Sequence, residues 1–153
     1  GPGVAGVSIE DRHGIGLYPI ALATERIRAS RQAIDRSGEN VLLVGRSEGL
    51  LLGNTTIDTT VERLIAYAAA GADCVYAPGI RSLADIRALV TAVAPTPVNV
   101  LLIDPAMNVP ELAAAGVRRV SVGGGFAKAA WAAYERVARS VIEDGHWPRS
   151  KAS

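Results

Sequence analysis

Polar residues able to do chemistry stand at the ends of short apolar runs or within them. Glu10 and Asp11 follow the first run, Arg46 ends the second, and Asn99 lies inside the fourth. Carboxylate oxygens suit Mg²⁺, and the planar guanidinium of arginine grips a carboxylate or phosphonate through two hydrogen bonds. A buried asparagine needs polar partners, and a substrate oxygen is one candidate. Together these residues indicate a site for a small anionic substrate.

Each of these residues also has a structural interpretation. Glu10 and Asp11 could instead cap a helix or bond to a loop. Arg46 has two potential ion-pair partners. Glu48 is two residues further along the chain, and Glu10 stands at the end of the first apolar run as Arg46 does at the end of the second. For Asn99, a backbone partner satisfies the side chain as well as a substrate does. The sequence alone leaves these alternatives open.

Three glycines at 123–125 precede the last segment with helical character. Backbone N–H groups at such a turn are able to cradle an anion, and barrel enzymes often bind phosphate after their last two strands. Gly123 and Gly124 are therefore candidate substrate-binding residues. The alternative is that the glycines only form a tight turn.

Composition and the absence of certain residues narrow the function classes. The chain has 153 residues, of which 49% are hydrophobic and 20% charged, as expected of a globular domain. A net charge of +1 gives no electrostatic case for nucleic acid or an anionic membrane. No apolar run approaches the roughly 20 residues of a membrane helix. The only lysines, Lys128 and Lys151, lie outside the apolar runs, which disfavours a Schiff-base aldolase.

The single cysteine, Cys74, lies within an apolar run and cannot form an internal disulfide. We expect it to be a small buried hydrophobic residue in a protein of the reducing cytoplasm. His13 follows Asp11 in a glycine-containing loop, where a surface histidine is expected, although proton transfer is an alternative role.

Five apolar runs alternate with segments of helical period, so we predict an α/β fold. Continuous apolar runs are typical of strands covered on both faces. Repeated strand–helix–strand units require parallel strands with right-handed crossovers, in an open sheet or in part of a (β/α)₈ barrel. The predicted strands cover residues 4–9, 41–45, 74–77, 98–103 and 117–122.

Start signals for the helices agree with this alternation. Thr59 and Glu62 have the spacing of a capping box, in which each side chain satisfies a free backbone N–H group. Ser82 and Asp85 form a weaker version. Pro110 is suited to the first turn of a short helix, where no N–H is needed.

Several segments, taken in order, resemble the isocitrate lyase and phosphoenolpyruvate mutase superfamily. The first apolar run and its carboxylates resemble the fourth barrel strand of that superfamily, and the later segments resemble the fifth to eighth strands. The segments read G-V-A-G-V-S-I-E-D at 3–11, G-R-S-E at 45–48 (where the family usually has A-R-T-D), A-Y-A-A-A-G-A-D at 66–73, P-V-N-V at 97–100 and G-V-R-R-V-S at 116–121.

The resemblance implies a partial TIM-type (β/α)₈ barrel containing strands four to eight. We expect a barrel domain of five β/α units over residues 1–145 and a flexible tail over 146–153. A whole barrel needs about 250 residues, so three units are missing from this chain. The family's other metal-binding aspartates belong to strands two and three, and only the glutamate position, Glu10, is present.

The resemblance also implies a function: a Mg²⁺-dependent lyase-type enzyme acting on a small 2-oxo- or 2-hydroxy-carboxylate through an enolpyruvate-like intermediate. In that interpretation Glu10 and Asp11 contact the metal, while Arg46 and Asn99 bind the substrate and Arg46 stabilises the enolate. Alternatives are a phosphonate mutase, an oxaloacetate-type hydrolase, or a non-catalytic fragment lacking most of the metal site. The lyase branch carries a catalytic cysteine after strand four, and this chain has none there. Exposed strand edges predict a homo-oligomer.

Overall fold

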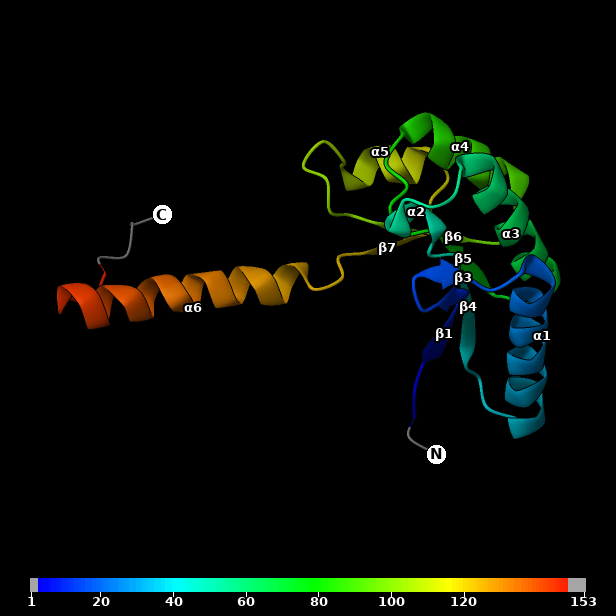
Figure 1. Cartoon of the computed structure of the whole chain (residues 1–153), viewed down its shortest axis with the longest axis horizontal. Helices are drawn as coiled ribbons and strands as arrows, with labels where there is room; N and C mark the ends of the chain where they lie inside the picture. The colour runs from blue at the N-terminus through cyan, green and yellow to red at the C-terminus, as the bar shows by residue number, and fades with distance from the viewer. Residues whose placement is uncertain (1–2, 149–153) are drawn as a thin grey trace. The chain divides into compact units, whose positions relative to one another are not determined.

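A computed structural model describes residues 3–148 and divides the chain into two compact units, Gly1–Ser121 and Val122–Ser153. The first unit contains a five-stranded sheet in which all neighbouring strands are parallel, in the order β1-β4-β5-β6-β7. This confirms the predicted α/β fold (Figure 1). The strands are β1 (Gly6–Glu10), β4 (Leu42–Arg46), β5 (Cys74–Tyr76), β6 (Val98–Leu101) and β7 (Arg119–Ser121).

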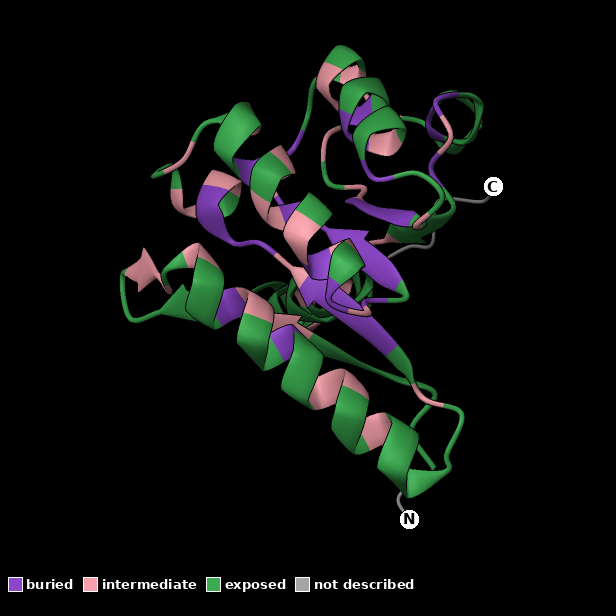
Figure 2. Ribbon diagram, turned by 90° about the vertical axis from the view of Figure 1, so that its right-hand side faces the viewer, coloured by how far each residue is buried: buried purple, intermediate pink, exposed green. Residues whose placement is uncertain are grey.

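Helices connect successive strands of the sheet, as right-handed parallel crossovers require. They lie to one side of the strands in Figures 1 and 2 and leave the opposite side of the sheet without a helical layer from this unit. Sequential strand order with helices on one side is the arrangement of a barrel segment. The helices are α1 (Ile20–Ser37), α2 (Gly49–Leu52), α3 (Ile57–Ala69), α4 (Leu83–Ala92) and α5 (Val109–Ala114).

The two faces of the sheet bury different sets of side chains because successive residues of a strand point to opposite faces. Leu43, Val75 and Val98 face the helices and belong to the main hydrophobic core. Val44 and Tyr76 belong to a second, smaller cluster on the other face. In Figure 2 the central strands of the sheet are buried, and the outward surfaces of the helices are exposed. We call these the helix face and the inner face of the sheet.

Two of the three predicted helix starts are confirmed. The Ser82 side chain accepts a hydrogen bond from the Asp85 N–H, and Pro110 lies in the first turn of α5. The capping box at Thr59 was wrong, because the helix begins one turn earlier. Thr56 has extended backbone angles and its hydroxyl accepts from the Thr59 N–H, so Thr59 is already helical.

Between β1 and α1 the chain forms a short antiparallel hairpin that the apolar pattern does not reveal. Its strands are β2 (Arg12–His13) and β3 (Gly16–Leu17). Gly14 has a φ of +58°, which favours glycine at this turn. The His13 ring is stacked on the Tyr18 ring with their centres 4.9 Å apart. The histidine is exposed, as expected of a surface residue.

The second unit contains α6 (Gly125–Asp144), which ends at Gly145 with a left-handed backbone (φ +68°). None of the residues of α6 is buried. Of the predicted flexible tail, residues 149–153 lie outside the described residues. Over residues 3–148, no helix is both long enough and apolar enough to span a membrane.

Candidate functional site

Glu10, Arg46 and Asn99 lie in one cross-strand row of the sheet. Glu10 and Arg46 are the last residues of β1 and β4, whereas Asn99 is the second residue of β6. Glu10 pairs in register with Arg46, Arg46 with Tyr76, and Tyr76 with Asn99. Paired positions on parallel strands share a face, so the four side chains emerge on the inner face of the sheet. In a β/α barrel, the carboxyl ends of the strands carry the active site.

Arg46 is the most connected residue of this row. Its Nε donates to Glu48 Oε1, its Nη1 lies 3.3 Å from Glu10 Oε1, and its guanidinium stands 5.1 Å from the centre of the Tyr76 ring. Burial alone would lower the pKa of Arg46, but the hydrogen bond and charge of Glu48, together with Glu10 and Tyr76, raise it. The result is a permanently charged fork with fixed orientation, which suits a carboxylate.

Asn99 presents an unsatisfied oxygen on the same face. Its Nδ2 donates to Ser121 Oγ at 3.0 Å, while its Oδ1 is buried and has no hydrogen-bond partner among the described residues. Two strand spacings separate Asn99 from Arg46, about 10 Å, and Tyr76 lies between them. A buried polar atom without a partner is costly, so this oxygen is a candidate contact for a ligand hydroxyl or amine.

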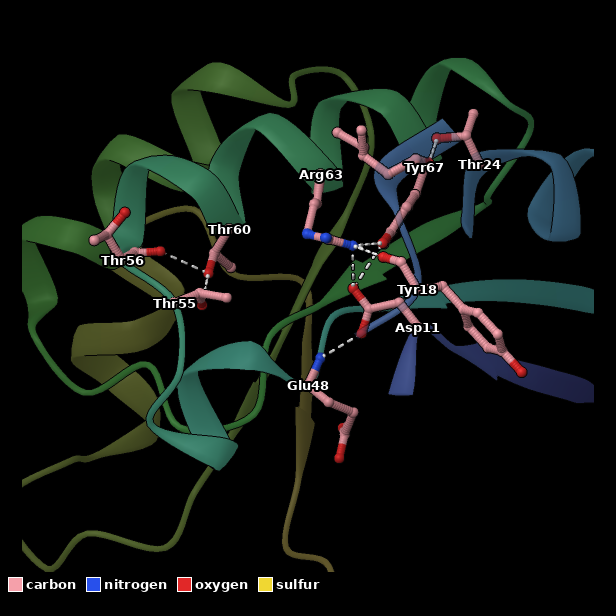
Figure 3. Close-up of polar contacts among 10 residues, drawn as sticks. Asp11, Tyr18, Thr24, Glu48, Thr55, Thr56, Thr60, Arg63 and Tyr67 are labelled. Atoms are coloured by element: carbon pink, nitrogen blue, oxygen red, sulfur yellow. Dashed lines mark hydrogen bonds and ion pairs between the residues drawn. The ribbon is translucent and has the colours of Figure 1, made fainter. Parts of the chain in front are cut away.

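Asp11 does not join the row, because it is the next residue after Glu10 and points to the opposite face. Its side chain is only 1% exposed and is held by α3: Tyr67 Oη donates to Oδ2 at 2.7 Å and Arg63 Nη1 lies 3.2 Å from the same atom. Its Oδ1 accepts from the Glu48 N–H at 2.9 Å. Figure 3 shows the Asp11 carboxylate at the centre of these contacts.

The ionisation of Tyr67 reflects this environment. Burial, followed by the hydrogen bond and negative charge of Asp11, raises the pKa of Tyr67 well above its usual range, and the nearby Arg63 opposes the shift only in part. Tyr67 therefore stays a neutral donor to Asp11 at any ordinary pH. Both Asp11 oxygens accept hydrogen bonds from the protein, so in this structure Asp11 bonds a loop and a helix.

The residues present do not make up a magnesium site. Among residues 3–148, no group of three or more histidine, cysteine, aspartate or glutamate side chains is placed to share a metal ion. Asp11 is occupied by Arg63, Tyr67 and Glu48. Of the two carboxylates beside Arg46, Glu10 has 43% of its side chain exposed and Glu48 3%. Within the described residues, the row therefore offers one exposed carboxylate, that of Glu10.

The glycine turn belongs to the second unit. Gly123 has a φ of +52° and Gly124 precedes the first turn of α6. A tight turn with a left-handed backbone favours glycine at position 123, so this glycine has a structural explanation.

Two residues of the site, Tyr76 and Glu48, are not predicted as site residues from the sequence. Tyr76 was seen only as part of an apolar run, although its place next to the strand end matches that of Arg46. Glu48 was named only as an ion-pair partner, yet it is almost completely buried beside Arg46. A buried glutamate two residues after a strand-end arginine is the signal that could have revealed it.

Cys74 is buried on the inner face, as expected of a small hydrophobic residue. Burial raises the pKa of the Cys74 thiol, and the neighbouring Arg119 offsets this only in part. A thiol kept protonated in this way is a poor nucleophile.

Comparison with known proteins agrees with this geometry. The sequence profile of the phosphoenolpyruvate phosphomutase family matches residues 2–142. An uncharacterised protein of Mycobacterium tuberculosis H37Rv is 33% identical over 95% of this chain and 55% of its own length. An oxaloacetate decarboxylase of Rhodopseudomonas palustris CGA009 is 29% identical over 97% of this chain and 52% of its own length.

Solved structures give the same assignment. A Burkholderia cenocepacia J2315 protein classed as a lyase or mutase superposes with a TM-score of 0.90 and 40% identity, over 99% of this chain and 56% of that one. Oxaloacetate acetylhydrolase in complex with its product oxalate superposes with a TM-score of 0.85 and 26% identity, over 96% and 53%. The chain spans about half the length of these relatives, consistent with a partial barrel. It belongs to the phosphoenolpyruvate phosphomutase family, within the superfamily that its sequence motifs predict.

Proposed function

We propose that this chain forms part of a lyase-type barrel enzyme that makes or breaks a bond next to the carbonyl of a small 2-oxo-carboxylate or its 2-hydroxy counterpart. The observation that carries the proposal is the row in which Glu10, Arg46 and Tyr76, the last residues of their strands, continue in register to the buried Asn99 of β6. The relatives named as oxaloacetate decarboxylase and oxaloacetate acetylhydrolase act on a substrate of this class, which supports the same choice.

In this proposal Arg46 binds the substrate carboxylate and Asn99 a second polar group about two strands away. Arg46 is suited to the first role because its fork is oriented by Glu48 and Tyr76, so little reorganisation is needed when charge develops on an enolate. Asn99 is suited to the second because its Oδ1 has no partner of its own.

Magnesium dependence belongs to the proposal for the whole enzyme and not to this chain alone. Glu10 is the residue that would contact the ion, and further ligands would have to come from strands that this chain lacks. When bound, the ion would supply Lewis-acid stabilisation of the developing enolate. A cytoplasmic location is also proposed, since the one thiol is buried and has no disulfide partner in the chain.

The decisive experiment measures turnover of a panel of 2-oxo and 2-hydroxy acids by the longest available product of the gene, with Mg²⁺. We expect at least one acid to be cleaved or hydrolysed. Arg46→Lys should reduce kcat/KM by about 100-fold, because an ammonium cannot reproduce a bidentate contact. Arg28→Lys, on the exposed surface of α1, is the matched control and should leave turnover unchanged. Full activity in Arg46→Lys would overturn the role of this residue.

A non-catalytic partial barrel is the second candidate. It is favoured by the lack of a three-residue metal-binding cluster among residues 3–148 and by the missing strand-four cysteine of the lyase branch. A well-folded gene product that turns over none of the acids, with or without Mg²⁺, would establish this alternative. A phosphonate mutase would instead rearrange a phosphonate substrate and leave the carboxylic acids untouched.

A further inference from the structure

Arg46 has two carboxylate partners of very different character. The Glu48 side chain is 3% exposed and accepts from Nε, whereas the Glu10 side chain is 43% exposed and lies beside Nη1. Solvent screens the exposed pair much more strongly than the buried one. An incoming carboxylate therefore competes with Glu10 for the Nη groups of the Arg46 guanidinium, while Glu48 stays hydrogen-bonded to Nε.

Glu48 is in turn held from the helix face of the sheet. Its backbone N–H donates to Asp11 Oδ1 at 2.9 Å, and Asp11 Oδ2 accepts from Tyr67 and Arg63. Arg63 and Tyr67 are one turn apart on α3 and also bond each other, Nη1 to Oη at 3.3 Å. The contacts in Figure 3 therefore run from α3 through Asp11 to the backbone of Glu48.

This connection passes around the end of the sheet. Glu10 and Asp11 are consecutive but point to opposite faces, so β1 contributes one carboxylate to the Arg46 row and the other to the α3 anchor. The Asp11 N–H also donates to the Arg46 carbonyl at 3.1 Å, which ties the two strand ends together. Asp11 is thus bonded both to the backbone of Arg46 and to the backbone of Glu48, whose carboxylate accepts from Arg46.

We propose that Glu48 is a positioning residue that fixes the Arg46 guanidinium for an incoming carboxylate, and that Asp11, anchored by α3, holds Glu48 in place. The orientation of Arg46 is a property of the free chain. The benefit to a bound carboxylate rests on the proposed function. The two parts are therefore tested by separate measurements on the same variants.

The first measurement follows the Arg46 Nε–H group by ¹⁵N NMR, assigned by its loss in Arg46→Lys. In the wild type this proton should exchange slowly with water. Glu48→Gln should speed exchange about tenfold or more, the factor expected for loss of a charge-assisted hydrogen bond, and Glu48→Asp should restore at least part of the protection. Tyr67→Phe, which leaves Asp11 its Arg63 partner, should speed exchange by a smaller factor. Glu25→Gln, at an exposed ion pair on α1, should change nothing.

The second measurement is the dissociation constant of oxalate by calorimetry on the longest gene product. Glu48→Gln should weaken binding about tenfold, and Glu48→Asp should bind more tightly than Glu48→Gln. Equal Nε–H exchange in the wild type and Glu48→Gln would overturn the positioning role, even if Glu48→Gln weakened oxalate. If the wild type does not bind oxalate, this result counts against the proposed function only. The positioning role of Glu48 is still tested by the Nε–H exchange rates. If Glu48→Gln does not fold, the Nε–H exchange rates of Glu48→Asp and Tyr67→Phe are compared with that of the control, Glu25→Gln. Exchange no faster in these two variants than in the control would overturn the positioning role.

Discussion

The Tyr67 hydroxyl donates a 2.7 Å hydrogen bond to Asp11 Oδ2, joining the middle of α3 to the residue that follows β1. Both side chains are almost fully buried. With Arg63 they form an anchor beneath the candidate site, on the face of the sheet opposite to Arg46. The first two predictions concern this anchor.

Replacement of Asp11 by Asn should destabilise the protein strongly. The substitution leaves Arg63 as a buried charge without its carboxylate, a change that costs about 3 kcal/mol or more of the free energy of unfolding. Chemical denaturation measures it directly. Glu25→Gln is the matched control at an exposed pair with Arg28 and should shift stability by less than about 0.5 kcal/mol. A similar small effect for Asp11→Asn would show that the anchor contributes little.

Tyr67 should make stability fall at high pH. Its pKa is raised on folding, so the folded chain keeps the proton where the unfolded chain releases it. The contribution is fully present below the unfolded pKa of about 10 and is lost as pH rises toward the folded value. Tyr67→Phe should cost about 1–3 kcal/mol near neutrality but show a shallower decline above pH ~10. Parallel pH profiles for the two proteins would contradict the shift.

A methyl group at Gly45 should disturb the packing of β4 against α3. A Cβ built there would lie 2.8 Å from Tyr67 Cβ and 3.3 Å from Ala72 Cβ. We expect Gly45→Ala to destabilise by about 1–3 kcal/mol through overpacking, partly offset by the reduced freedom of the unfolded chain. Gly16→Ala is the control, because a Cβ built at Gly16 would have the His13 carbonyl oxygen as its nearest neighbour, 3.9 Å away. Thermal melting of both variants tests this, and a Gly45→Ala protein as stable as the control would refute it.

The 153-residue chain by itself should bind Mg²⁺ weakly or not at all. Glu10 is the one exposed carboxylate of the row, and Mg²⁺ sites usually need one or two carboxylates together with substrate oxygens. Calorimetric titration measures this, with Glu10→Gln as the comparison. A dissociation constant in the micromolar range that disappears in Glu10→Gln would prove the prediction wrong.

The chain should associate with itself. The outer edges of β1 and β7 have no neighbouring strand within the described sheet, and Val7 and Leu42 are exposed at the amino ends of their strands. Unpaired edges and exposed apolar side chains favour association. Light scattering should give a mass above that of one chain. A clean monomer at micromolar concentration would contradict this prediction.

Short-range features were predictable because they depend on neighbours in the chain. Continuous apolar runs located all five strands of the sheet, and their alternation with helical segments required parallel pairing. The pairing of Glu10 with Arg46 followed from the same logic, because each residue ends a parallel strand. Asn99 is the second residue of β6, and only the register between the strands brings it into the same row. The start of α3 was missed since Thr56 and Thr59 are both good caps, and only the backbone conformation of Thr56 distinguishes them.

The pattern of apolar runs identified Glu10, Arg46 and Asn99 as candidate site residues, and their types indicated the chemistry that they carry. The tertiary structure decided what each one contacts. Alternation along β1 already separates Glu10 from Asp11, but the partners of Asp11 lie 52 and 56 positions away in the chain. Only the packing of α3 against the sheet brings Arg63 and Tyr67 to it. Because such contacts depend on the relative placement of distant elements, no local pattern could specify that Asp11 is an anchor.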